Sequence, residues 1–538
     1  MKKQFKVSKD YILFPVKTGN KTETVAVYDD TEKIYEFEIP FNENADNNYV
    51  YDFQAAVPVK KWKEKEIVVS GNVSEDFLEQ ISFSDELPLN KEEKPLIHFS
   101  ANFGWMNDPC GVIYQNGLFH LYYQHNPFDI EWGNMSWGHA VSKDLIHWEH
   151  REEALLPDKE GTMFTGSAMI NTQGLFGLPE DAHIYVYTSS GGSSNWSKDR
   201  KFVQKVAWSV DNGETLHKMD GCIIDHMIGM NRDVKVYWHE EKKFYFAVMF
   251  LDGNEYAVLN SKDFVNWEVT QRLNLAPAWE CPDLVRVPVE GGGEKWVFWT
   301  GDGYYYVGEF DGSVFESNFV LHEAYHTLLP YAAQTFVGVD RIISIPWVRT
   351  NNKGKLFRSL MGIPRQLTLV KENDDYVLRM KLVDELEQYR ECMVDTKLSC
   401  DDACNGCMYY EQKEKAAVEL VIVPEKDAGF IAEIYGTKVT YDNKNICIYG
   451  IAERSNGVRD AAKLGDKEHI SSENQDYRVL ELNRIPEKIS VISDGEVLEI
   501  TIDDGMYGEV YETLADQKQG MISVEAKGSI CLNINQIK

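Results

Sequence analysis

The chain of 538 residues carries 86 acidic and 55 basic side chains, which gives a formal net charge of −31. This charge argues against nucleic acid or an anionic membrane as a partner and favours a neutral substrate such as a small molecule or a glycan. The length predicts two or three domains with ample core. Aromatic residues make up 12% of the chain, which fits a carbohydrate site and a β-rich core equally well.

The N-terminus begins with basic residues but has no apolar segment of the kind that precedes a signal cleavage site, and no apolar run is long enough to span a bilayer. Nine cysteines, an odd number scattered over the chain, indicate free thiols in a reducing compartment rather than a disulfide framework. The sequence therefore predicts a cytoplasmic protein, with secretion of a chain whose signal peptide has been trimmed as the alternative.

Residues 1–96 read as short β-strands separated by acidic and Asn-rich turns. Examples are the runs 11–16, 24–28 and 34–40. We expect a small β-sandwich here, with no group of residues that demands chemistry. A charged, Pro-ended linker at 91–95 leads into the next unit.

The stretch 105–111 combines a carboxylate with turn-forming residues. Pro109 fixes its own φ and pushes Asp108 away from the α region, and Gly111 permits a reversal. With apolar strand sequence on both sides, we expect Asp108 on a tight turn between two buried strands, presented as a nucleophile. The alternative is an Asx-turn aspartate without a chemical role, but the aromatic and amide residues that follow at 122–126 and 132–140 suit a sugar ring.

An internal repeat occupies the middle of the chain. The segment 142–149 (SKDLIHWE) recurs as 261–268 (SKDFVNWE), with a degenerate copy at 209–216. Strand-rich repeats with spacings of this order are typical of a β-propeller. The alternative is a generic all-β domain with coincidental Trp-Glu hairpins.

Two further acidic residues lie in the repeat region. Asp233 stands at the entry to a strand beside Arg232, which would favour its ionised form, although such pairs are often only structural. Glu280 lies between Trp279 and Cys281, and an apolar environment there would raise its pKa as a general acid requires. An ordinary strand-end glutamate is the alternative.

Taken together, these motifs resemble glycoside hydrolase family 32, the invertase, inulinase and levanase family. The match runs in order from about residue 98 to 370. It comprises Trp105-Met106-Asn107-Asp108-Pro109, Tyr123-Gln124-His125-Asn126-Pro127, Trp137-Gly138-His139-Ala140, Phe164-Thr165-Gly166-Ser167-Ala168, Arg232-Asp233, Glu280-Cys281-Pro282-Asp283, Ala333-Gln334-Thr335-Phe336 and Ile363-Pro364-Arg365-Gln366-Leu367. Each motif alone is weak, whereas eight in the correct order are specific.

The resemblance implies an all-β protein with a five-bladed β-propeller catalytic domain at 97–368 and a C-terminal β-sandwich at 369–538, after the N-terminal β domain at 1–96. It makes Asp108 the nucleophile, Glu280 the acid/base and Asp233 the transition-state stabiliser. The residues that would line the pocket for the terminal fructosyl unit are Asn107, Gln124, Trp132, Phe164, Ser167 and Arg232.

The implied reaction is a retaining hydrolysis of terminal β-D-fructosyl units from sucrose or fructans. Glu280 protonates the leaving oxygen, Asp108 captures the fructosyl C2, and water assisted by Glu280 releases fructose, which requires the two carboxyls about 5 to 5.5 Å apart. We expect neither a cofactor nor a metal ion, and a homo-oligomer is left open.

Three positions depart from the family pattern. Cys110 stands where Asn is usual, Val234 where Pro is usual, and Ser136 where His is common. The first and third changes leave the leaving-group preference open.

The C-terminal third alternates charged and apolar residues, as a β-sandwich does. Its segment 493–505 loosely resembles a family strand but lacks the usual Arg. Cys400, Cys404 and Cys407 have the spacing of an iron-sulfur triad, but they lie in turn sequence, which favours a structural metal or plain thiols.

Three other functions compete with a retaining fructosidase. They are an inverting arabinan-type propeller hydrolase, a transfructosylase, and a fructan-binding protein without catalysis. The sequence leaves open the choice among sucrose, sucrose phosphate, inulin-type and levan-type substrates.

Overall fold

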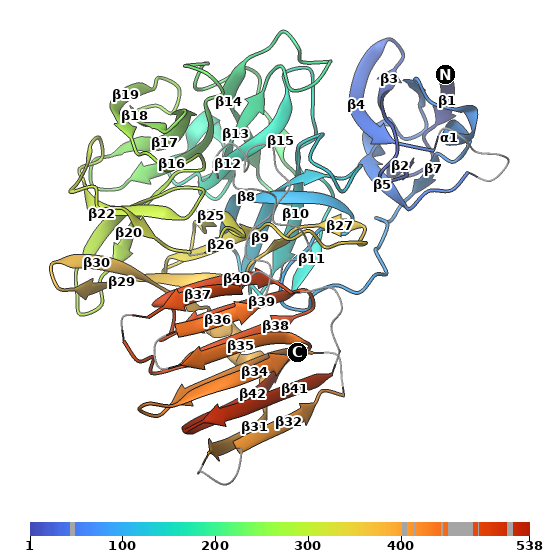
Figure 1. Cartoon of the computed structure of the whole chain (residues 1–538). Helices are drawn as coiled ribbons and strands as arrows, with labels where there is room; N and C mark the ends of the chain where they lie inside the picture. The colour runs from blue at the N-terminus through green and yellow to red at the C-terminus, as the bar shows by residue number, and fades with distance from the viewer. Residues whose placement is uncertain are drawn as a thin grey trace.

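The computed structural model describes residues 1–42, 49–325, 327–400, 406–413, 416–442, 445–449, 477–482, 484–513 and 520–538. In this part of the chain the regular structure is almost entirely strand, with one short α-helix, α1 (Glu75–Glu79), and three short 3-10 helices, η1 (Lys60–Trp62), η2 (Leu175–Gly177) and η3 (Asp384–Tyr389). The predicted all-β class is confirmed. The strands form an N-terminal, a central and a C-terminal group (Figure 1).

The N-terminal group has two sheets that pack face to face. In sheet order their strands are β1 (Lys2–Lys6), β6 (Glu66–Gly71), β3 (Thr22–Asp29) and β4 (Glu32–Pro40), and then β5 (Phe53–Pro58), β2 (Tyr11–Val16) and β7 (Ser82–Ser84). Alternating apolar residues such as Phe14, Val25, Phe37 and Val57 fill the space between the sheets. The strand β4 lies at an edge of its sheet.

The central group has five sheets that follow one another in the chain, each built as a meander of neighbouring antiparallel strands. The first is β8 (Gly104–Gln115), β9 (Leu118–Asn126), β10 (Ser136–Ser142) and β11 (Trp148–His150), with β27 (Phe357–Arg358) added beside β8. The second is β12 (Thr162–Ile170), β13 (His183–Ser190), β14 (Phe202–Ser209) and β15 (His217–Lys218). The third is β16 (Arg232–His239), β17 (Phe244–Asp252), β18 (Glu255–Ser261) and β19 (Glu268–Asn274). The fourth is β20 (Asp283–Pro288), β21 (Glu294–Trp299), β22 (Tyr304–Phe310) and β23 (Phe315–Ser317), with β24 (His322–Glu323). The fifth is β25 (Pro330–Thr335), β26 (Ile343–Val348), β29 (Arg365–Glu372) and β30 (Asp375–Leu382), with β28 (Leu360–Met361).

The first strands of the five sheets lie beside one another. Strand β8 contacts both β12 and β25, and β12 also contacts β16. The Val236 backbone N–H donates to Ser167 Oγ at 3.1 Å, which joins β16 to β12. Lys235 Nζ lies 3.4 Å from Asp283 Oδ2, which joins β16 to β20. The start of each first strand therefore faces the same end of the central group.

The sequence repeat marks one kind of connection in three of these sheets. The copies at 142–149 and 261–268 join β10 to β11 and β18 to β19, and the degenerate copy at 209–216 joins β14 to β15. In the first two copies the aspartate accepts a backbone hydrogen bond three residues ahead, Asp144 from His147 at 2.7 Å and Asp263 from Asn266 at 2.8 Å. The repeat therefore marks the loop that leads into the last strand of each of these three sheets.

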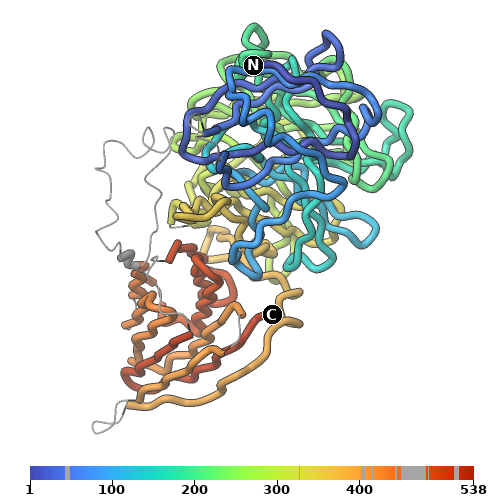
Figure 2. The backbone as a smooth tube through the Cα atoms, turned by 90° about the vertical axis from the view of Figure 1, so that its right-hand side faces the viewer, coloured from blue at the N-terminus to red at the C-terminus, as the bar shows by residue number. Residues whose placement is uncertain are grey.

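The C-terminal group consists of two six-stranded sheets, which form the lower body in Figure 2. The first sheet contains β31 (Arg390–Ser399), β42 (Ser529–Ile537), β33 (Ala417–Pro424), β38 (Ile489–Asp494), β39 (Val497–Ile502) and β40 (Tyr507–Glu512). The second contains β32 (Gly406–Glu411), β41 (Met521–Lys527), β34 (Gly429–Ile434), β35 (Thr437–Asp442), β36 (Asn445–Tyr449) and β37 (Tyr477–Glu481). One apolar core, which includes Leu420, Phe430, Val524 and Leu532, lies between them.

We propose a boundary after Leu382 instead of the expected boundary at 368. Strand β29 pairs with β26, and β30 pairs with β29, so the fifth central sheet extends beyond residue 369. The cysteine triad falls in the C-terminal part. Cys400 and Cys407 are exposed, and Cys404 lies outside the described residues.

A buried charged cluster ties the C-terminal part to the central sheets, and its acids come from the segment 493–505. Asp494 Oδ2 lies 2.9 Å from His98 Nδ1, and Glu499 Oε1 lies 3.1 Å from His98 Nε2. Arg365 donates to Glu499 Oε2 at 2.6 Å. Although burial alone would lower it, the two carboxylates raise the pKa of His98 to about 9. The arginine that we noted as missing from this segment is thus supplied to it from β29.

Buried histidines in the first two sheets carry the opposite pKa shift. Burial lowers the pKa of His183 to about 4 and that of His120 to about 3. Each is therefore neutral in the fold at a pH where it is protonated in the unfolded chain. Stability from these groups is present above about pH 6.5 and is lost as the pH falls toward the folded pKa.

We expect the variant His183→Gln to show a weaker dependence of the free energy of unfolding on pH. Between pH 6 and 5 the slope should fall by up to about 1.4 kcal/mol per pH unit, because one fewer proton is taken up on unfolding. Urea unfolding of the wild type and the variant at several pH values measures this slope. An equal slope in both proteins would contradict the assignment.

Candidate active site

Asp108 lies inside the long strand β8 and not on a turn between two strands, so that expectation is wrong. The register with β9 skips Asp108, since Met106 pairs with His125 and the next paired residue is Pro109. Pro109 has no N–H to give to the ladder, which explains the bulge, but pairing with β9 resumes and the strand continues. The bulge turns the Asp108 carboxylate out of the ladder.

Two neighbours hold the Asp108 carboxylate. Thr165 Oγ1 on β12 donates to Asp108 Oδ2 at 2.6 Å, and Asn107 Nδ2 donates to Oδ1 at 3.2 Å. Burial and the nearby Glu280 raise the pKa of Asp108, and these two hydrogen bonds oppose that shift. The carboxylate is fixed on both oxygens, as a nucleophile with one direction of attack needs to be.

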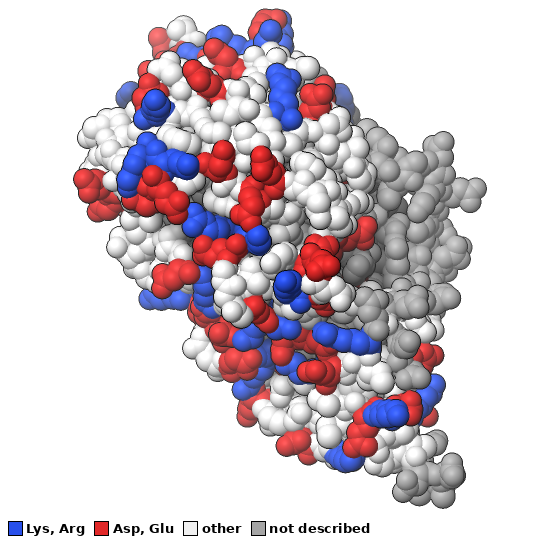
Figure 3. Space-filling view, turned by 90° about the vertical axis from the view of Figure 1, so that its left-hand side faces the viewer, with Lys and Arg blue, Asp and Glu red and all other residues white. Residues whose placement is uncertain are grey.

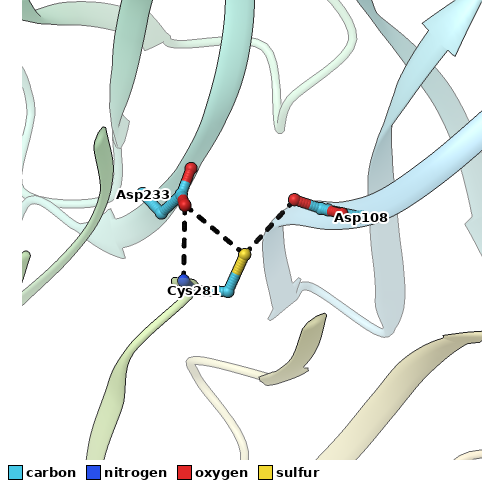
Figure 4. A group of neighbouring side chains, drawn as sticks. All are labelled: Asp108, Asp233 and Cys281. Carbon is cyan, nitrogen blue, oxygen red and sulfur yellow. Dashed lines mark hydrogen bonds between the residues drawn. The ribbon is translucent and has the colours of Figure 1, made fainter. Parts of the chain in front are cut away.

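Asp233 faces Asp108 across a single thiol (Figure 4). Cys281 Sγ donates at 3.4 Å to Asp108 Oδ2 and at 3.5 Å to Asp233 Oδ2, and the Cys281 backbone N–H also donates to Asp233 Oδ2 at 3.3 Å. Asp233 has φ of 60° and Cys281 has φ of 44°, a region that non-glycine residues rarely adopt. Such strain at buried positions is typical of functional sites.

Arg232 favours the ionised form of Asp233, as expected, but it does not alone decide the pKa of this carboxyl. Burial raises the pKa of Asp233, Arg232 opposes this, and Glu280 and Asp108 raise it again, to about 7. The adjacent arginine therefore does not keep this carboxyl fully ionised at neutral pH, because two other carboxyls share the same buried space. Burial and the neighbouring carboxyls therefore disfavour the fully ionised form of this cluster.

Glu280 lies in the loop between β19 and β20 with φ of 41°. Its Oε2 accepts from Arg232 Nε at 3.1 Å and from a second guanidinium nitrogen of Arg232, and its Oε1 accepts from the Tyr331 hydroxyl at 2.9 Å. The apolar environment expected for this residue is therefore wrong, since both carboxylate oxygens have polar partners. Arg232 also lies 3.4 Å from Asp233 Oδ2, so it bridges two of the three acids.

The residues predicted to line the pocket fall into two groups. Asn107 and Arg232 touch the carboxylates directly, as described above. Trp132 meets the ring of Phe164 edge to face at 6.0 Å between centroids, and 49% of Trp132 is exposed while Phe164 is buried. This pair forms an aromatic wall with one open face, which a sugar ring can cover.

Gln124 and Ser167 are engaged in packing between elements. Gln124 Nε2 donates to the Met163 carbonyl at 2.8 Å, and Ser167 Oγ accepts from the Val236 backbone at 3.1 Å. Both side chains are buried, so in this structure they join neighbouring strands around the site.

Three residues in the site were not predicted as members of it. Thr165 and Cys281 lie inside recognised motifs, next to Phe164 and Glu280. Their hydroxyl and thiol groups could have identified them as hydrogen-bond donors to the carboxylates. Tyr331 stands in β25 without a motif of its own that marks it. Its contact with Glu280 spans 51 residues and depends on how the fifth sheet meets the fourth.

The three departures from the family pattern are all buried. Cys110 Sγ accepts a long contact from Gln124 Nε2 at 3.6 Å, and Ser136 Oγ donates to the Asn134 carbonyl at 2.9 Å. Val234 packs in an apolar core between the second and third sheets. Cys110 is two positions after Asp108, and its Sγ donates to the Asp108 carbonyl at 3.5 Å. Ser136 supports the loop that carries Trp132.

Ligand atoms of Asp108, Asp233 and Cys281 all lie within 4.8 Å of one another, a spacing that a metal ion could bridge. Burial and the nearby carboxylates raise the pKa of the Cys281 thiol far above its usual value. A metal would need the thiolate, so this environment favours the thiol as a hydrogen-bond donor.

Comparison with known proteins matches residues 98–380 to the glycosyl hydrolases family 32 N-terminal domain, which is more than half of the chain. The chain belongs to glycoside hydrolase family 32. The resemblance seen in the motifs is therefore confirmed.

Family 32 relatives include a levanase of Bacillus subtilis, which is 31% identical over 409 residues, 68% of this chain and 59% of that protein. An extracellular exo-inulinase of Meyerozyma guilliermondii is 33% identical over 324 residues, 53% of this chain and 60% of that protein. The chain thus spans about three fifths of the length of the curated relatives it matches. The exo-inulinase structure of Aspergillus awamori superposes with a TM-score of 0.69 at 24% identity and covers 82% of this chain and 98% of that one.

These family 32 relatives correct the predicted location. Matched inulinases are named extracellular enzymes, so the cytoplasmic expectation is wrong. The described cysteines are free, as expected, but the inference from free thiols to a reducing compartment does not agree with these relatives. Among the described residues, no helix has the length and apolar character to cross a membrane. On the face drawn in Figure 3, acidic side chains lie among basic ones, and its coloured residues offer no basic stripe for phosphate groups.

Proposed function

We propose that this protein is a retaining glycoside hydrolase that releases terminal β-D-fructosyl units from sucrose or fructans. One observation carries the proposal. Asp108 from the first central sheet, Asp233 from the third, and Glu280 from the loop before the fourth converge in one buried cluster with Arg232 and Cys281. Burying three carboxyls together costs free energy, and such a group is therefore typical of a catalytic site.

Each carboxyl has a role that its contacts support. Asp108, held on both oxygens by Thr165 and Asn107, attacks the fructosyl C2. Glu280 protonates the leaving oxygen and then activates water, and Tyr331 and Arg232 fix its direction. Asp233 accepts hydrogen bonds from the sugar hydroxyls as positive charge develops at C2.

The proton that the general acid needs is available within the cluster. The pKa of Asp233 is raised to about 7, and that of Asp108 is also raised, because three acids share one arginine in a buried space. Before bond cleavage the cluster holds this proton close to neutral pH. Binding of substrate hydroxyls to Asp233 then favours its ionised form.

We also propose that the five central sheets are the blades of a β-propeller. Their first strands carry Asp108, Asp233 and Tyr331, and Glu280 directly precedes the first strand of the fourth sheet. Strand β20 also contacts β25, so the contacts run through β8, β12, β16, β20 and β25 and back to β8. This supports a closed ring, with the acids at one end of its axis.

The relatives' names support a fructan or sucrose substrate, and a transfructosylase remains the second candidate because only the acceptor differs. The test is the release of reducing sugar from sucrose, a short inulin-type oligosaccharide and levan, with product analysis in 1 M sucrose. We expect free fructose as the main product. Longer oligosaccharides as the main product would favour the transfructosylase, and no product from any of the three would favour the binding protein. Inverted stereochemistry would favour the arabinan-type hydrolase.

A further inference from the structure

The loop between β9 and β10, which carries Trp132, is anchored in the N-terminal domain. Phe128 of this loop is fully buried and belongs to the core of that domain, not to a core of the central sheets. Its ring lies 4.3 Å from Phe37 and 6.2 Å from Phe14, measured between centroids. The start of the loop is therefore fixed by residues of the first forty positions of the chain.

The end of the same loop is fixed to the edge strand β4. Asn134 Oδ1 accepts from the Glu38 backbone N–H at 2.8 Å, and Asn134 Nδ2 donates to the Glu38 carbonyl at 2.8 Å. The side-chain amide thus pairs with the open edge of β4 as a neighbouring strand would. Trp132 lies between these two attachments, four residues after Phe128 and two before Asn134.

A second loop, between β13 and β14, meets the same strand. The Trp196 backbone N–H donates to Glu36 Oε1 at 2.9 Å, and Lys33 Nζ lies 5.3 Å from the centre of the Trp196 ring. In Figure 1, β4 lies on the side of the N-terminal domain that faces the central sheets.

Both loops lie at the end of the central sheets where the acids gather. The last residue of β9, Asn126, pairs with Trp105 near the start of β8, and the last residue of β13, Ser190, pairs with Thr162 at the start of β12. Asp108 follows Trp105 by three residues, and Thr165 follows Thr162 by three residues. The strand β4 is therefore placed beside the outer wall of the carboxylate site.

We propose that the N-terminal domain is a functional part of the substrate site. Its strand β4 holds Trp132 in position. Together with Trp196, β4 also extends the wall that contacts sugar units beyond the terminal fructosyl unit. The proposal rests on the proposed function. A half-exposed tryptophan on a free loop would lose conformational freedom on binding, and the two attachments remove that cost beforehand. The family match begins at residue 98, so the strand β4 that anchors the loop lies outside it.

The test is Asn134→Gly, with Asn116→Gly as its matched control. Both asparagines have positive φ, 43° and 52°, so glycine fits both backbones without strain. Asn116 donates to Asn212 at 3.0 Å in the β8–β9 turn, at the opposite end of the sheet. The two variants thus lose similar side chains, but only the first releases the Trp132 loop from β4.

We expect Asn134→Gly to raise KM for an inulin-type trisaccharide about three- to tenfold with kcat within about twofold of wild type. The reason is that three hydrogen bonds that position the Trp132 loop are lost, two to Glu38 of β4 and one to Asn126 Oδ1 at 3.0 Å. Asn116→Gly should match wild type. A second variant, Glu36→Ala, should raise KM for the trisaccharide more than KM for sucrose.

Equilibrium binding of the trisaccharide by calorimetry, in an Asp108→Asn background, separates this inference from the proposed function. Weaker binding in Asn134→Gly but not in Asn116→Gly supports the inference even if wild type releases no fructose, a result that would defeat the proposed function alone. The inference is overturned if Asn134→Gly and Asn116→Gly have equal KM and equal affinity for the trisaccharide. It is also overturned if neither variant binds the trisaccharide in the Asp108→Asn background.

Discussion

Asp108→Asn and Glu280→Gln are each expected to lower fructose release by at least about 10³-fold while the fold is kept. Asparagine retains the size of Asp108 and can still bond to Thr165, but it cannot form the ester with C2. Glutamine can still accept from Tyr331, but it has no proton to transfer. Initial rates with sucrose and a short fructan, together with thermal unfolding of each variant, measure both parts of the expectation.

Asp263→Asn serves as the control for these two substitutions. Asp263 lies in the repeat loop between β18 and β19. It is exposed, and it lies at the end of its sheet opposite to Asp233. We expect its rate to equal that of wild type. Wild-type rates in Asp108→Asn would remove this residue from the chemistry.

Arg365→Met is expected to destabilise the protein by about 3 to 5 kcal/mol, the largest stability effect that we expect from a single substitution. Arg365 and Glu499 are both about 1% exposed, and Arg365 also donates to the Met380 carbonyl at 3.2 Å and to Thr501 at 3.1 Å. Although burial alone would raise it, Arg365 and His98 lower the pKa of Glu499 to about 2. Without the arginine, a buried carboxylate loses its main partner.

Arg379→Met on the neighbouring strand β30 is the matched control. Its ion pair with Glu290 is partly exposed, and such pairs contribute about 0 to 1 kcal/mol. Urea midpoints of the two variants should therefore differ clearly. The double variant Arg365→Met with Glu499→Leu should recover part of the loss, since no charge is then left unpaired. Equal midpoints for the two single variants would show that the buried cluster does not hold the C-terminal part in place.

The sequence was sufficient to name the acids but not their environment. Asp108, Asp233 and Glu280 stand in ordered motifs that a single chain displays, so their meeting in one cluster could be expected. The bond from Cys281 to Asp108 joins residues 173 positions apart, and no local pattern encodes it. For the same reason Glu280 was expected among apolar groups, whereas Arg232 and Tyr331 reach it from two other sheets.

Local turn chemistry was informative only in part. Pro109 does interrupt the ladder, as its missing N–H requires, but a turn was the wrong outcome because cross-strand pairing with β9 carries the strand past the bulge. The role of the N-terminal domain could not be read from its sequence at all. This domain contacts the Trp132 loop through the backbone of Glu38 and through its apolar core, in which Phe128 packs. Neither contact produces a recognisable pattern in the sequence of residues 1–96.

The most direct test of the central claim is mass spectrometry of the Glu280→Gln variant after reaction with β-fructosyl fluoride. Fluoride leaves without help from an acid, whereas hydrolysis of the intermediate needs the Glu280 base, so the fructosyl-enzyme should accumulate. We predict a mass gain of one fructosyl unit on the peptide that contains Asp108, and no gain when Asp108→Asn is added. A fructosyl unit on another residue, or turnover of the fluoride with no adduct and inverted product, would contradict the account.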